Sequence, residues 1–304
     1  MILLFLSWYV PPWVWSVPLG IGVIWPYLGL LLCGWGIWKD KKYRIFWVGG
    51  LLGWGLSLGV VWQLWPTLPQ SSSCLRIASF NMDGAHYNRK QIERLADSLR
   101  KWHPHILCLQ EVFLGDYTVE KFAKRLGYAN YAFLDAGAHM GMLVLSDLPI
   151  LRSYQHYLLP GSTNGIQEVR LQMEKGSEVV LLNVHFPSYR LGSRERWSFR
   201  WLRIVWNTQR YFAFLLLRLI DLHKSNLLGV CGDFNAPPYY PLYRQLRSRL
   251  YDAFEVASWG EGPTWRYPWL RIDYVWCSAP PVRYKVRWLE GQSHGYVEGG
   301  FAVR

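Results

Sequence analysis

The sequence has 304 residues, 51% of them hydrophobic, which is enough for one large domain or two ordinary ones with a sizeable core. Its formal net charge of +12 favours partners that carry phosphate, such as nucleic acid or anionic lipid headgroups; a basic surface that only keeps the protein in solution is the alternative. The absence of an internal repeat, a low-complexity tract or a metal-type cysteine spacing argues against repeat architectures and cysteine-ligated metals.

The N-terminal part contains two long uncharged runs. Residues 1–38 carry no charged side chain, and a second uncharged run extends over 45–65. A membrane span takes about 20 apolar residues, and a Pro-Pro pair in the first run would break a helix. We therefore predict transmembrane helices at about 1–16, 18–38 and 45–65, so that residues 1–66 form a membrane anchor of two to three spans. A cleaved signal peptide and a buried helical hairpin are the alternatives.

The charges near the last predicted span give the orientation of this anchor. The short loop before that span holds four basic residues, Lys39, Lys41, Lys42 and Arg44. Such loops stay in the cytoplasm, so the last span should exit on the other side of the membrane. We therefore expect a multi-pass protein of the cell membrane with an extracytoplasmic catalytic domain. A multi-span transporter is excluded, because too few residues remain to form its spans.

After a polar linker at 67–74, residues 75–304 have the composition of a globular domain. Because residues 1–66 hold four basic side chains and one acidic one, this domain carries a formal charge of +9. Short apolar runs bounded by turn residues predict strands at "LRIASFN", "ILCLQEV", "GMLVLSD", "EVVLLNVHF", "LLGVCGDFN", "RIDYVWCS" and "EGGFAV".

Helix-like segments alternate with some of these strands, at "NRKQIERLADSLRKW", "TVEKFAKRLGY" and "RERWSFRWLRIVWNTQRYFAFLLLRLIDLHK". The domain is therefore predicted to be of mixed α and β class. The last of these helices is unusually apolar and aromatic, and we favour its packing on the core over contact with a bilayer.

The cysteines give little information on the compartment. Cys108 and Cys231 lie inside apolar strand-like runs, where cysteine behaves as a small core residue. A disulfide between two of Cys74, Cys108, Cys231 and Cys277 would fit an oxidising compartment, and the sequence leaves this open.

Polar residues stand where the predicted strands end. They are Asn81 and Asp83 in "SFNMDG", Glu111 in "LCLQEV", His185 in "LLNVHFPS", and Asp233 and Asn235 in "GDFN"; in addition, Asp273 interrupts the strand "RIDYVW", and His294 precedes the last strand. Each one alone is typical of a turn, a cap or a structural histidine. Together, polar groups at successive strand ends can converge on one rim of a sheet.

The motifs "FNMDG", "LQEV", "NVHFPS", "GDFN", "TW" before "RIDYV", and "SHGYVEGGFAV", in this order, resemble the endonuclease/exonuclease/phosphatase superfamily with its DNase I-like fold. This superfamily includes AP endonucleases, neutral sphingomyelinases and inositol polyphosphate 5-phosphatases. The resemblance covers 75–304 and not the predicted membrane segment. It implies an α+β fold, a four-layer αββα sandwich, with a divalent metal, Mg²⁺ or Mn²⁺, at the sheet rim.

The resemblance also implies the metal ligands. Glu111 corresponds to the principal ligand, since a hard cation prefers carboxylate oxygen. Asp83 and Asn81 correspond to supporting positions around the metal. The superfamily usually has an aspartate directly before the last histidine, and here that residue is Ser293. We therefore expect either metal binding that is weaker or more dependent on Glu111 and Asp83, or reduced activity.

The same resemblance implies the catalytic residues. Asp273 and His294 correspond to a carboxylate and imidazole pair that handles the attacking water or a phosphate oxygen. Asp233 corresponds to the residue that positions or deprotonates the water, and Asn235 to the amide that holds the phosphoryl group. His185 corresponds to the histidine that binds the scissile phosphate in the nuclease and sphingomyelinase branches.

The sequence thus predicts a membrane-anchored, divalent-metal-dependent phosphoesterase that hydrolyses phosphodiester or phosphomonoester bonds. Its expected partners are a phosphate-ester substrate, either nucleic acid or a phospholipid headgroup, and the lipid bilayer; no protein partner is predicted. The alternative is a catalytically weak or silent phosphate-binding module that retains the fold, for which Ser293 is the support.

Overall fold

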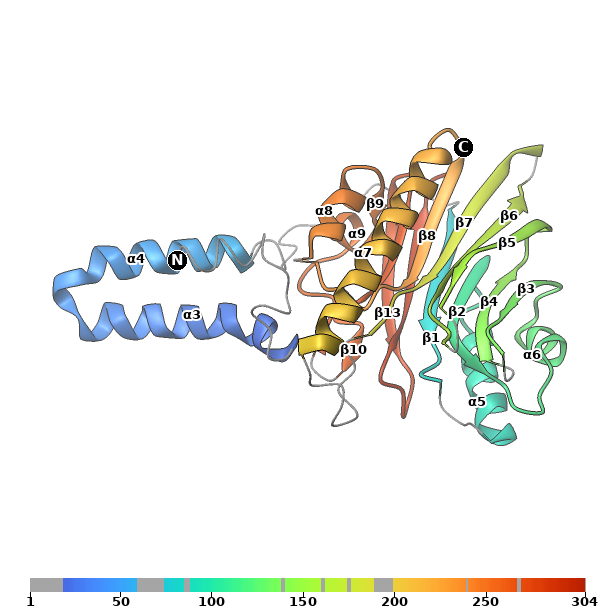
Figure 1. Ribbon diagram of the computed structural model, residues 1–304, viewed down its shortest axis with the longest axis horizontal. Helices are drawn as coiled ribbons and strands as arrows, with labels where there is room; N and C mark the ends of the chain where they lie inside the picture. Colours follow the sequence, from blue (N-terminus) through green and yellow to red (C-terminus); the bar gives the residue numbers. More distant parts are fainter. Residues whose placement is uncertain are drawn as a thin grey trace.

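Two six-stranded β-sheets pack face to face in this computed structural model, and helices cover their outer faces (Figure 1). The strand order is β13-β14-β1-β2-β4-β3 in the first sheet and β5-β6-β7-β8-β12-β9 in the second, and β10 and β11 form a small separate sheet. The expected α+β sandwich with four layers is therefore confirmed.

The structure describes residues 19–58, 74–84, 88–137, 140–159, 162–173, 176–188, 199–238, 240–266 and 269–303. The strands of the first sheet are β1 (Leu75–Asn81), β2 (Ile106–Phe113), β3 (Asn130–Asp135), β4 (Met140–Ser146), β13 (Pro281–Trp288) and β14 (Gly295–Phe301). Those of the second are β5 (Ile150–Leu158), β6 (Gly165–Gln172), β7 (Glu178–His185), β8 (Leu227–Asp233), β9 (Tyr251–Asp252) and β12 (Asp273–Cys277); β10 is Trp265–Arg266 and β11 is Trp269–Leu270. The described helices are α3 (Leu19–Lys39), η1 (Lys41–Tyr43), α4 (Arg44–Leu58), α5 (Arg89–Arg100), α6 (Val119–Leu126), α7 (Phe199–Leu222), α8 (Pro241–Arg247) and α9 (Ala253–Ala257).

Three apolar clusters form the core, one at each contact between layers. Ile77 of β1 and Val275 of β12 belong to the cluster between the sheets. A second cluster joins the first sheet to α5 and α6, and a third joins the second sheet to α7 and α8. Central strands are thus covered on both faces, which explains why β1 and β2 read as nearly continuous apolar runs.

The helices α5 and α6 begin and end where their sequences direct. Asn88 and Gln91 form a reciprocal capping box that starts α5. The side chain of Thr118 caps α6, and Gly127 ends it in the left-handed conformation, which glycine adopts without a steric penalty. Both helices therefore confirm the segments predicted from the sequence.

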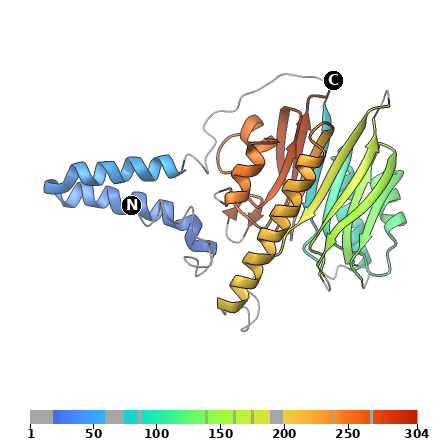
Figure 2. The same cartoon turned by 45° about the horizontal axis from the view of Figure 1, so that its top comes forward.

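The N-terminal helices α3 and α4 form an antiparallel pair, called here the α3–α4 hairpin, which projects from the sandwich (Figures 1 and 2). α3 overlaps the helical segment predicted at 18–38, and α4 covers the first part of the one predicted at 45–65, of which residues 59–65 lie outside the described residues. Within the part of the chain that the structure describes, however, no helix is long and apolar enough to cross a membrane. The expected transmembrane helices are thus not seen there, and the one predicted at 1–16 lies outside the described residues.

Several elements were not predicted from the sequence: β3, β5, β6, β13, the short strands β9 to β11, and the helices α8 and α9. β3, β5 and β13 are edge strands, so each has a neighbour on one side only. Their sequences mix charged or polar residues with apolar ones, and they contain no apolar run of the kind used to predict strands.

All five cysteines are free, so no disulfide is present. Cys108 and Cys231 are fully buried in the cluster between the two sheets. The interpretation of these two residues as small core residues is therefore confirmed.

Candidate functional site

The register of the second sheet brings three predicted site residues into one row. His185 ends β7, Asp233 ends β8 and Asp273 begins β12. His185 is paired with Asp233 across the parallel strands, and Asp233 is paired with Asp273 across the antiparallel strands. All three side chains are buried. The row places one imidazole and two carboxylates at the same rim.

The first sheet contributes Asn81 and Glu111 to this rim. Asn81, at the end of β1, donates from Nδ2 to Glu111 Oε1 at 3.2 Å and to Asp233 Oδ2 at 2.9 Å. Glu111 lies at an irregularity in the pairing of β2 with β4, where an extra residue turns the side chain away from the regular pleat. One amide thus holds together two carboxylates from different sheets.

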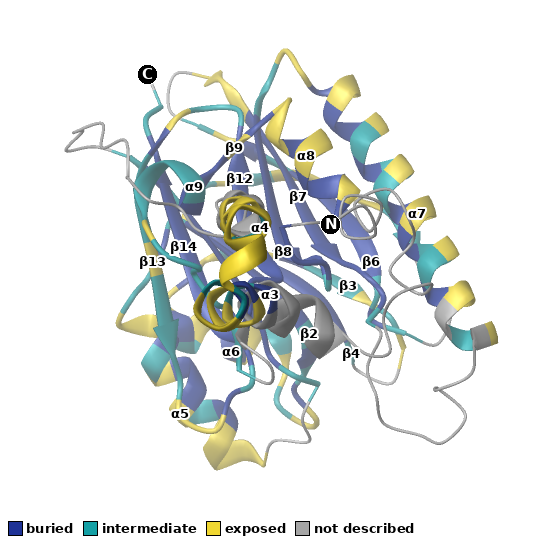
Figure 3. Ribbon diagram, turned by 90° about the vertical axis from the view of Figure 1, so that its left-hand side faces the viewer, coloured by how far each residue is buried: buried dark blue, intermediate teal, exposed yellow. Residues whose placement is uncertain are grey.

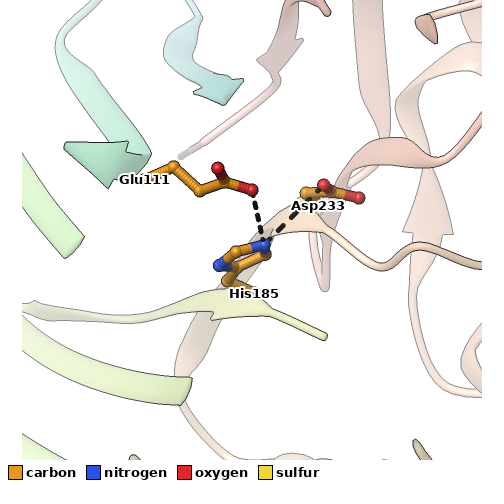
Figure 4. A group of neighbouring side chains, drawn as sticks. All are labelled: Glu111, His185 and Asp233. Atoms are coloured by element: carbon orange, nitrogen blue, oxygen red, sulfur yellow. Dashed lines mark ion pairs between the residues drawn. The ribbon is translucent and has the colours of Figure 1, made fainter. Parts of the chain in front are cut away.

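His185 lies between Glu111 and Asp233 (Figure 4). Its Nε2 is 3.3 Å from Glu111 Oε1 and 3.9 Å from Asp233 Oδ2. On the other side of the ring, Nδ1 is 3.1 Å from the backbone carbonyl of Thr163. A carbonyl only accepts, so Nδ1 carries a proton and Nε2 faces the two carboxylates.

Charge and burial act in opposite directions on this pair. Burial favours the neutral form of the Glu111 carboxyl, but the hydrogen bond and charge of His185 and the amide of Asn81 lower its pKa to about 2. Burial likewise favours neutral His185, whereas the Glu111 carboxylate raises the pKa of the imidazole. At neutral pH, Glu111 is therefore an anion.

His294 forms the second carboxylate and imidazole pair. Its Nδ1 is 3.1 Å from Asp273 Oδ2, and its Nε2 is 3.9 Å from Asp233 Oδ2. Burial alone would favour the neutral ring, but the charge and hydrogen bond of Asp273 raise the pKa of His294 to about 10. The pair predicted from the sequence is brought together, with the imidazole in its protonated form at neutral pH.

Asp233 occupies the centre of the site. Its Oδ2 is 3.9 Å from Nε2 of each of the two histidines, His185 and His294. Burial, and next the charge of Asp273, raise the pKa of Asp233 to about 6, and both imidazoles oppose this shift. A carboxylate with a pKa this close to neutrality is suited to accept a proton.

The backbone is held in an uncommon conformation at the site. Of the four described non-glycine residues with positive φ, three are predicted site residues: Asp83 at 67°, Glu111 at 49° and Asn235 at 47°. Such conformations persist only where the surroundings enforce them, and they are typical of functional sites. Gly232, directly before Asp233, has φ 147°, and a Cβ there would lie 1.9 Å from the carbonyl oxygen of Val184. This explains the glycine of "GDFN".

The side chain of Asn235 is directed back toward the rim. Its Nδ2 donates to the carbonyl of Phe186 at 2.9 Å and to Asp233 Oδ2 at 3.1 Å. Its backbone N–H also donates to Asp233 Oδ1 at 2.8 Å. Asn235 therefore orients the Asp233 carboxylate here, and contact of its amide with a phosphoryl group stays a prediction.

Asp83 and Ser293 meet at the edge of the site. The hydroxyl of Ser293 donates to Asp83 Oδ2 at 2.6 Å, and the backbone N–H of Asp83 donates to Asn81 Oδ1 at 2.7 Å. The oxygen of Asn81 is thus engaged by the backbone, while its nitrogen faces the carboxylates. The supporting metal roles expected for Asp83 and Asn81 stay predictions.

The donor set at the rim fits a divalent cation. Two groups of three side chains have donor atoms that all lie within 4.8 Å of one another: Glu111, His185 and Asp233 in one, and Asp233, Asp273 and His294 in the other. The three carboxylates supply the oxygen ligands that Mg²⁺ and Mn²⁺ prefer. Burial, and next the negative charge of Asp273, raise the pKa of Asp233, and a dication nearby would offset the part of this shift that comes from charge. Of these carboxylates, Glu111 would hold it, and Asp233 would remain free to accept a proton.

Some residues behind the rim were not predicted from the sequence. Gln110 donates to Asn183 Oδ1 at 2.7 Å and to Ser79 Oγ at 3.1 Å, and Asn183 donates to Gln167 Oε1 at 3.3 Å. All four are fully buried. In the sequence, these residues are single polar residues inside apolar runs such as "LCLQEV" and "LLNVHF". The prediction of strands treated the whole runs as apolar and so passed over them.

Thr264 is a further support that was not assigned a role. Its Oγ1 accepts hydrogen bonds from the backbone N–H groups of Ile272 and Asp273, each at 3.0 Å. The hydroxyl thereby fixes the start of β12, where the Asp273 side chain projects. The threonine belongs to the "TW" motif, so the sequence marked its position but not its function.

Comparisons with known proteins place most of the chain in one sequence family. A sequence model described as the Endonuclease/Exonuclease/phosphatase family matches residues 78–296, a range that includes every predicted site residue. No curated protein matches the sequence.

Solved structures share the fold at low identity. The human Nocturnin catalytic domain with bound sulfate anion is 20% identical, with a TM-score of 0.56 over 75% of this chain and 94% of that chain. Truncated TDP2 from Caenorhabditis elegans is 19% identical, with a TM-score of 0.56 over 75% and 98% of the two chains. An endonuclease/exonuclease/phosphatase from Bacteroides vulgatus is 13% identical, with a TM-score of 0.58 over 77% and 100%. These similarities concern the fold.

Proposed function

This chain belongs to the endonuclease/exonuclease/phosphatase family, and we propose on that basis that it is a divalent-metal-dependent phosphoesterase acting on phosphodiester or phosphomonoester bonds. The observation that carries the proposal is the position of Asp233, whose Oδ2 lies 3.9 Å from Nε2 of both His185 and His294. A buried carboxylate between two imidazoles offers a proton acceptor beside two donors, which phosphate-ester hydrolysis requires.

The proposed roles follow from the protonation states. Asp233, with a pKa of about 6, orients a water molecule and accepts its proton as the water attacks phosphorus. His294, with a pKa of about 10, donates from Nε2 to a phosphate oxygen and stabilises the charge that develops there. His185 faces the same space and would bind a second phosphate oxygen. Bound Mg²⁺ or Mn²⁺ would supply positive charge for the non-bridging oxygens.

The test is hydrolysis by the purified full chain of bis(p-nitrophenyl) phosphate and p-nitrophenyl phosphate, each with and without Mg²⁺ and Mn²⁺. Metal-stimulated release of nitrophenol supports the proposal, and the ratio of the two rates shows whether a diester or a monoester is preferred. Nucleic acid and phospholipid headgroups are then compared as natural substrates. No release at any metal concentration would overturn the proposal.

A catalytically weak or silent phosphate-binding module is the second candidate, and Ser293 favours it. A serine hydroxyl donates to Asp83 Oδ2 where the family usually has a second carboxylate. One anionic oxygen is thereby missing from the region in which a dication is expected. Phosphate binding without hydrolysis by the full chain would support this candidate.

Replacing Ser293 by aspartate tests whether position 293 contributes to metal binding. Ser293→Asp removes a hydrogen bond to Asp83 and sets two carboxylates side by side, so the metal-free protein should lose thermal stability. A dication relieves that repulsion, and the concentration of Mg²⁺ for half-maximal activity should fall about tenfold.

The control is Ser293→Ala, which removes the same hydrogen bond without adding charge, and which should not increase metal affinity. The measurements are a Mg²⁺ titration of activity and of the unfolding temperature. Equal metal dependence in the wild type and Ser293→Asp would show that position 293 does not contribute to metal binding.

Membrane attachment is part of the proposal, and the α3–α4 hairpin supports it. Among its described side chains, the exposed large apolar ones are Leu31, Leu32, Trp35, Trp38, Ile45, Phe46, Val48 and Leu52, and Tyr43 is exposed beside the basic residues of the turn. Contiguous exposed apolar surface of this kind marks an interaction site. The hairpin would hold the protein at the cell membrane, with the catalytic domain outside the cytoplasm.

Protease accessibility tests this arrangement. Protease added to intact right-side-out vesicles should cleave the chain after Leu75 and leave the turn at Lys41 and Lys42 intact. Protection of the catalytic domain would instead place it in the cytoplasm and direct the search for substrates to intracellular nucleic acids and metabolites.

A further inference from the structure

The helix α7 has two faces of different use. Its inner face contributes Phe212 and Leu216 to the core against the second sheet. Its outer face carries four large apolar side chains with high exposure: Ile204 at 47%, Tyr211 at 50%, Phe214 at 56% and Leu222 at 70%. The predicted packing of this helix on the core is therefore confirmed for its inner face. It does not explain why the outer face is apolar.

The same outer face is strongly basic. Arg200, Arg203, Arg210 and Arg218 are exposed along α7. In the part of the chain that the structure describes, none of the four forms an ion pair, while Arg218 lies 5.4 Å from the ring centre of Phe214. The acidic residue near the C-terminal end of α7, Asp221, is paired with Arg249. The face thus presents unpaired positive charge interleaved with apolar side chains.

The helices on the opposite side of the sandwich provide the contrast (Figure 3). Among the described residues of α5 and α6, no large apolar side chain is exposed. Their charges include both signs, and two of the arginines are paired, Arg89 with Glu93 and Arg125 with Asp97. An ordinary solvated helix face of this protein therefore lacks both features of α7.

We propose that the outer face of α7 docks on an anionic lipid surface. A helix with a basic and apolar exposed face lies in the plane of the interface, with its apolar side chains in the acyl boundary and its arginines at the lipid phosphates. Figures 1 and 2 show that the N-terminal end of α7 lies on the side of the sandwich from which the α3–α4 hairpin projects.

Lipid fits this face better than nucleic acid does. Single-stranded nucleic acid is held by aromatic stacking and a basic groove. Two of the four exposed apolar residues, Ile204 and Leu222, are aliphatic and have no ring on which a base could stack. The face is the convex side of a helix, and its aliphatic residues would gain from transfer into the acyl region. The docking is independent of the proposed catalytic function, since no residue of the rim takes part.

A fluorescent probe on α7 tests the docking in the full chain. Phe214→Cys, in a Cys74→Ser background because the other native cysteines are buried, is labelled with an environment-sensitive dye. The emission should shift to the blue on vesicles of phosphatidylcholine mixed with phosphatidylglycerol. It should shift little on phosphatidylcholine alone. The same dye at Lys121→Cys on α6 should not respond to either.

Removal of the arginine charges from α7 measures how strongly they contribute to lipid binding. Each arginine near an anionic surface strengthens binding about fivefold, so Arg203→Gln with Arg210→Gln and Arg218→Gln should weaken docking about a hundredfold. The matched control removes three positive charges from the opposite face, Arg94→Gln with Lys121→Gln and Lys124→Gln, and should leave docking unchanged. The α3–α4 hairpin is identical in all variants.

Three outcomes would overturn the inference. The first is an emission at position 214 that does not change on the anionic vesicles. The second is an equal loss of docking in both triple variants, which would mean that only net charge matters. The third is a response of the probe to a duplex or single-stranded oligonucleotide and not to vesicles, which would assign the face to nucleic acid.

Discussion

Glu111→Gln should abolish metal-stimulated hydrolysis, lowering the rate by more than about a hundredfold. The Glu111 carboxylate is an anion at neutral pH, because His185 and Asn81 hold its pKa near 2 despite burial. An amide of the same size retains a hydrogen-bond acceptor but loses the charge that attracts a dication. The measurement is the rate as a function of Mg²⁺ concentration, together with calorimetric Mg²⁺ binding.

Glu120→Gln is the matched control, because it makes the same chemical change at an exposed position of α6. It should leave the metal dependence unchanged. Circular dichroism and the unfolding temperature establish that both variants fold. Unchanged Mg²⁺ activation of Glu111→Gln would remove Glu111 from the metal site.

Asp273→Asn should lower kcat by about 10²–10⁴-fold with little change in KM. The charge and hydrogen bond of Asp273 raise the pKa of His294 to about 10 against the effect of burial. Without that charge, the pKa of His294 should fall toward its ordinary value, because burial opposes the protonated ring, so more of the imidazole would be neutral at neutral pH. His294 could then no longer donate a charged hydrogen bond to phosphate.

The pH dependence of activity should also differ between the wild type and Asp273→Asn. In the wild type, activity should rise as Asp233 loses its proton near pH 6 and fall as His294 loses its proton near pH 10. In Asp273→Asn, the alkaline limb should move down by several pH units. The pKa of His294 is measured directly by NMR of the imidazole.

Asp147→Asn is the control, because it makes the same chemical change in another carboxylate and histidine pair. Asp147 Oδ1 lies 3.0 Å from His103 Nε2, and both side chains are partly exposed. Neither residue belongs to the site. It should change neither the rate nor the pH profile. If Asp273→Asn lowered the rate while the pKa of His294 stayed near 10, Asp273 would not act through the imidazole.

The central strands could be predicted from the sequence because burial on both faces makes them apolar runs with abrupt polar ends. "LRIASFN" coincides with β1, and the polar residues at the ends of β1, β7 and β8 meet at one rim as expected. The edge strands could not be predicted in this way. In β13, Arg283 and Arg287 are directed to the buried Glu298 of β14, a pairing that only the tertiary structure reveals.

The site residues could be predicted by type but not by arrangement. The sequence marked Asn81 and Glu111, yet the direction of the amide depends on the 2.7 Å hydrogen bond between Asn81 Oδ1 and the N–H of Asp83. Likewise, the choice of Nε2 as the nitrogen that faces the site depends on the carbonyl of Thr163 behind His185. The first contact joins residues only two positions apart and the second joins residues 22 positions apart, and the apolar runs used to predict strands specify neither of them.

The buried polar row of Ser79, Gln110, Asn183 and Gln167 has a consequence for precision. Apolar packing lets two sheets slide by small amounts at low cost, whereas hydrogen bonds in a dry interior permit one alignment. Gln110 and Asn183 make such a bond, at 2.7 Å, between the two sheets. One sheet carries Glu111 and the other carries Asp233. This hydrogen bond therefore fixes the position of the two carboxylates relative to each other. Loss of this hydrogen bond would lower the catalytic rate, because the sheets would be less well aligned, even though every reacting side chain was still present.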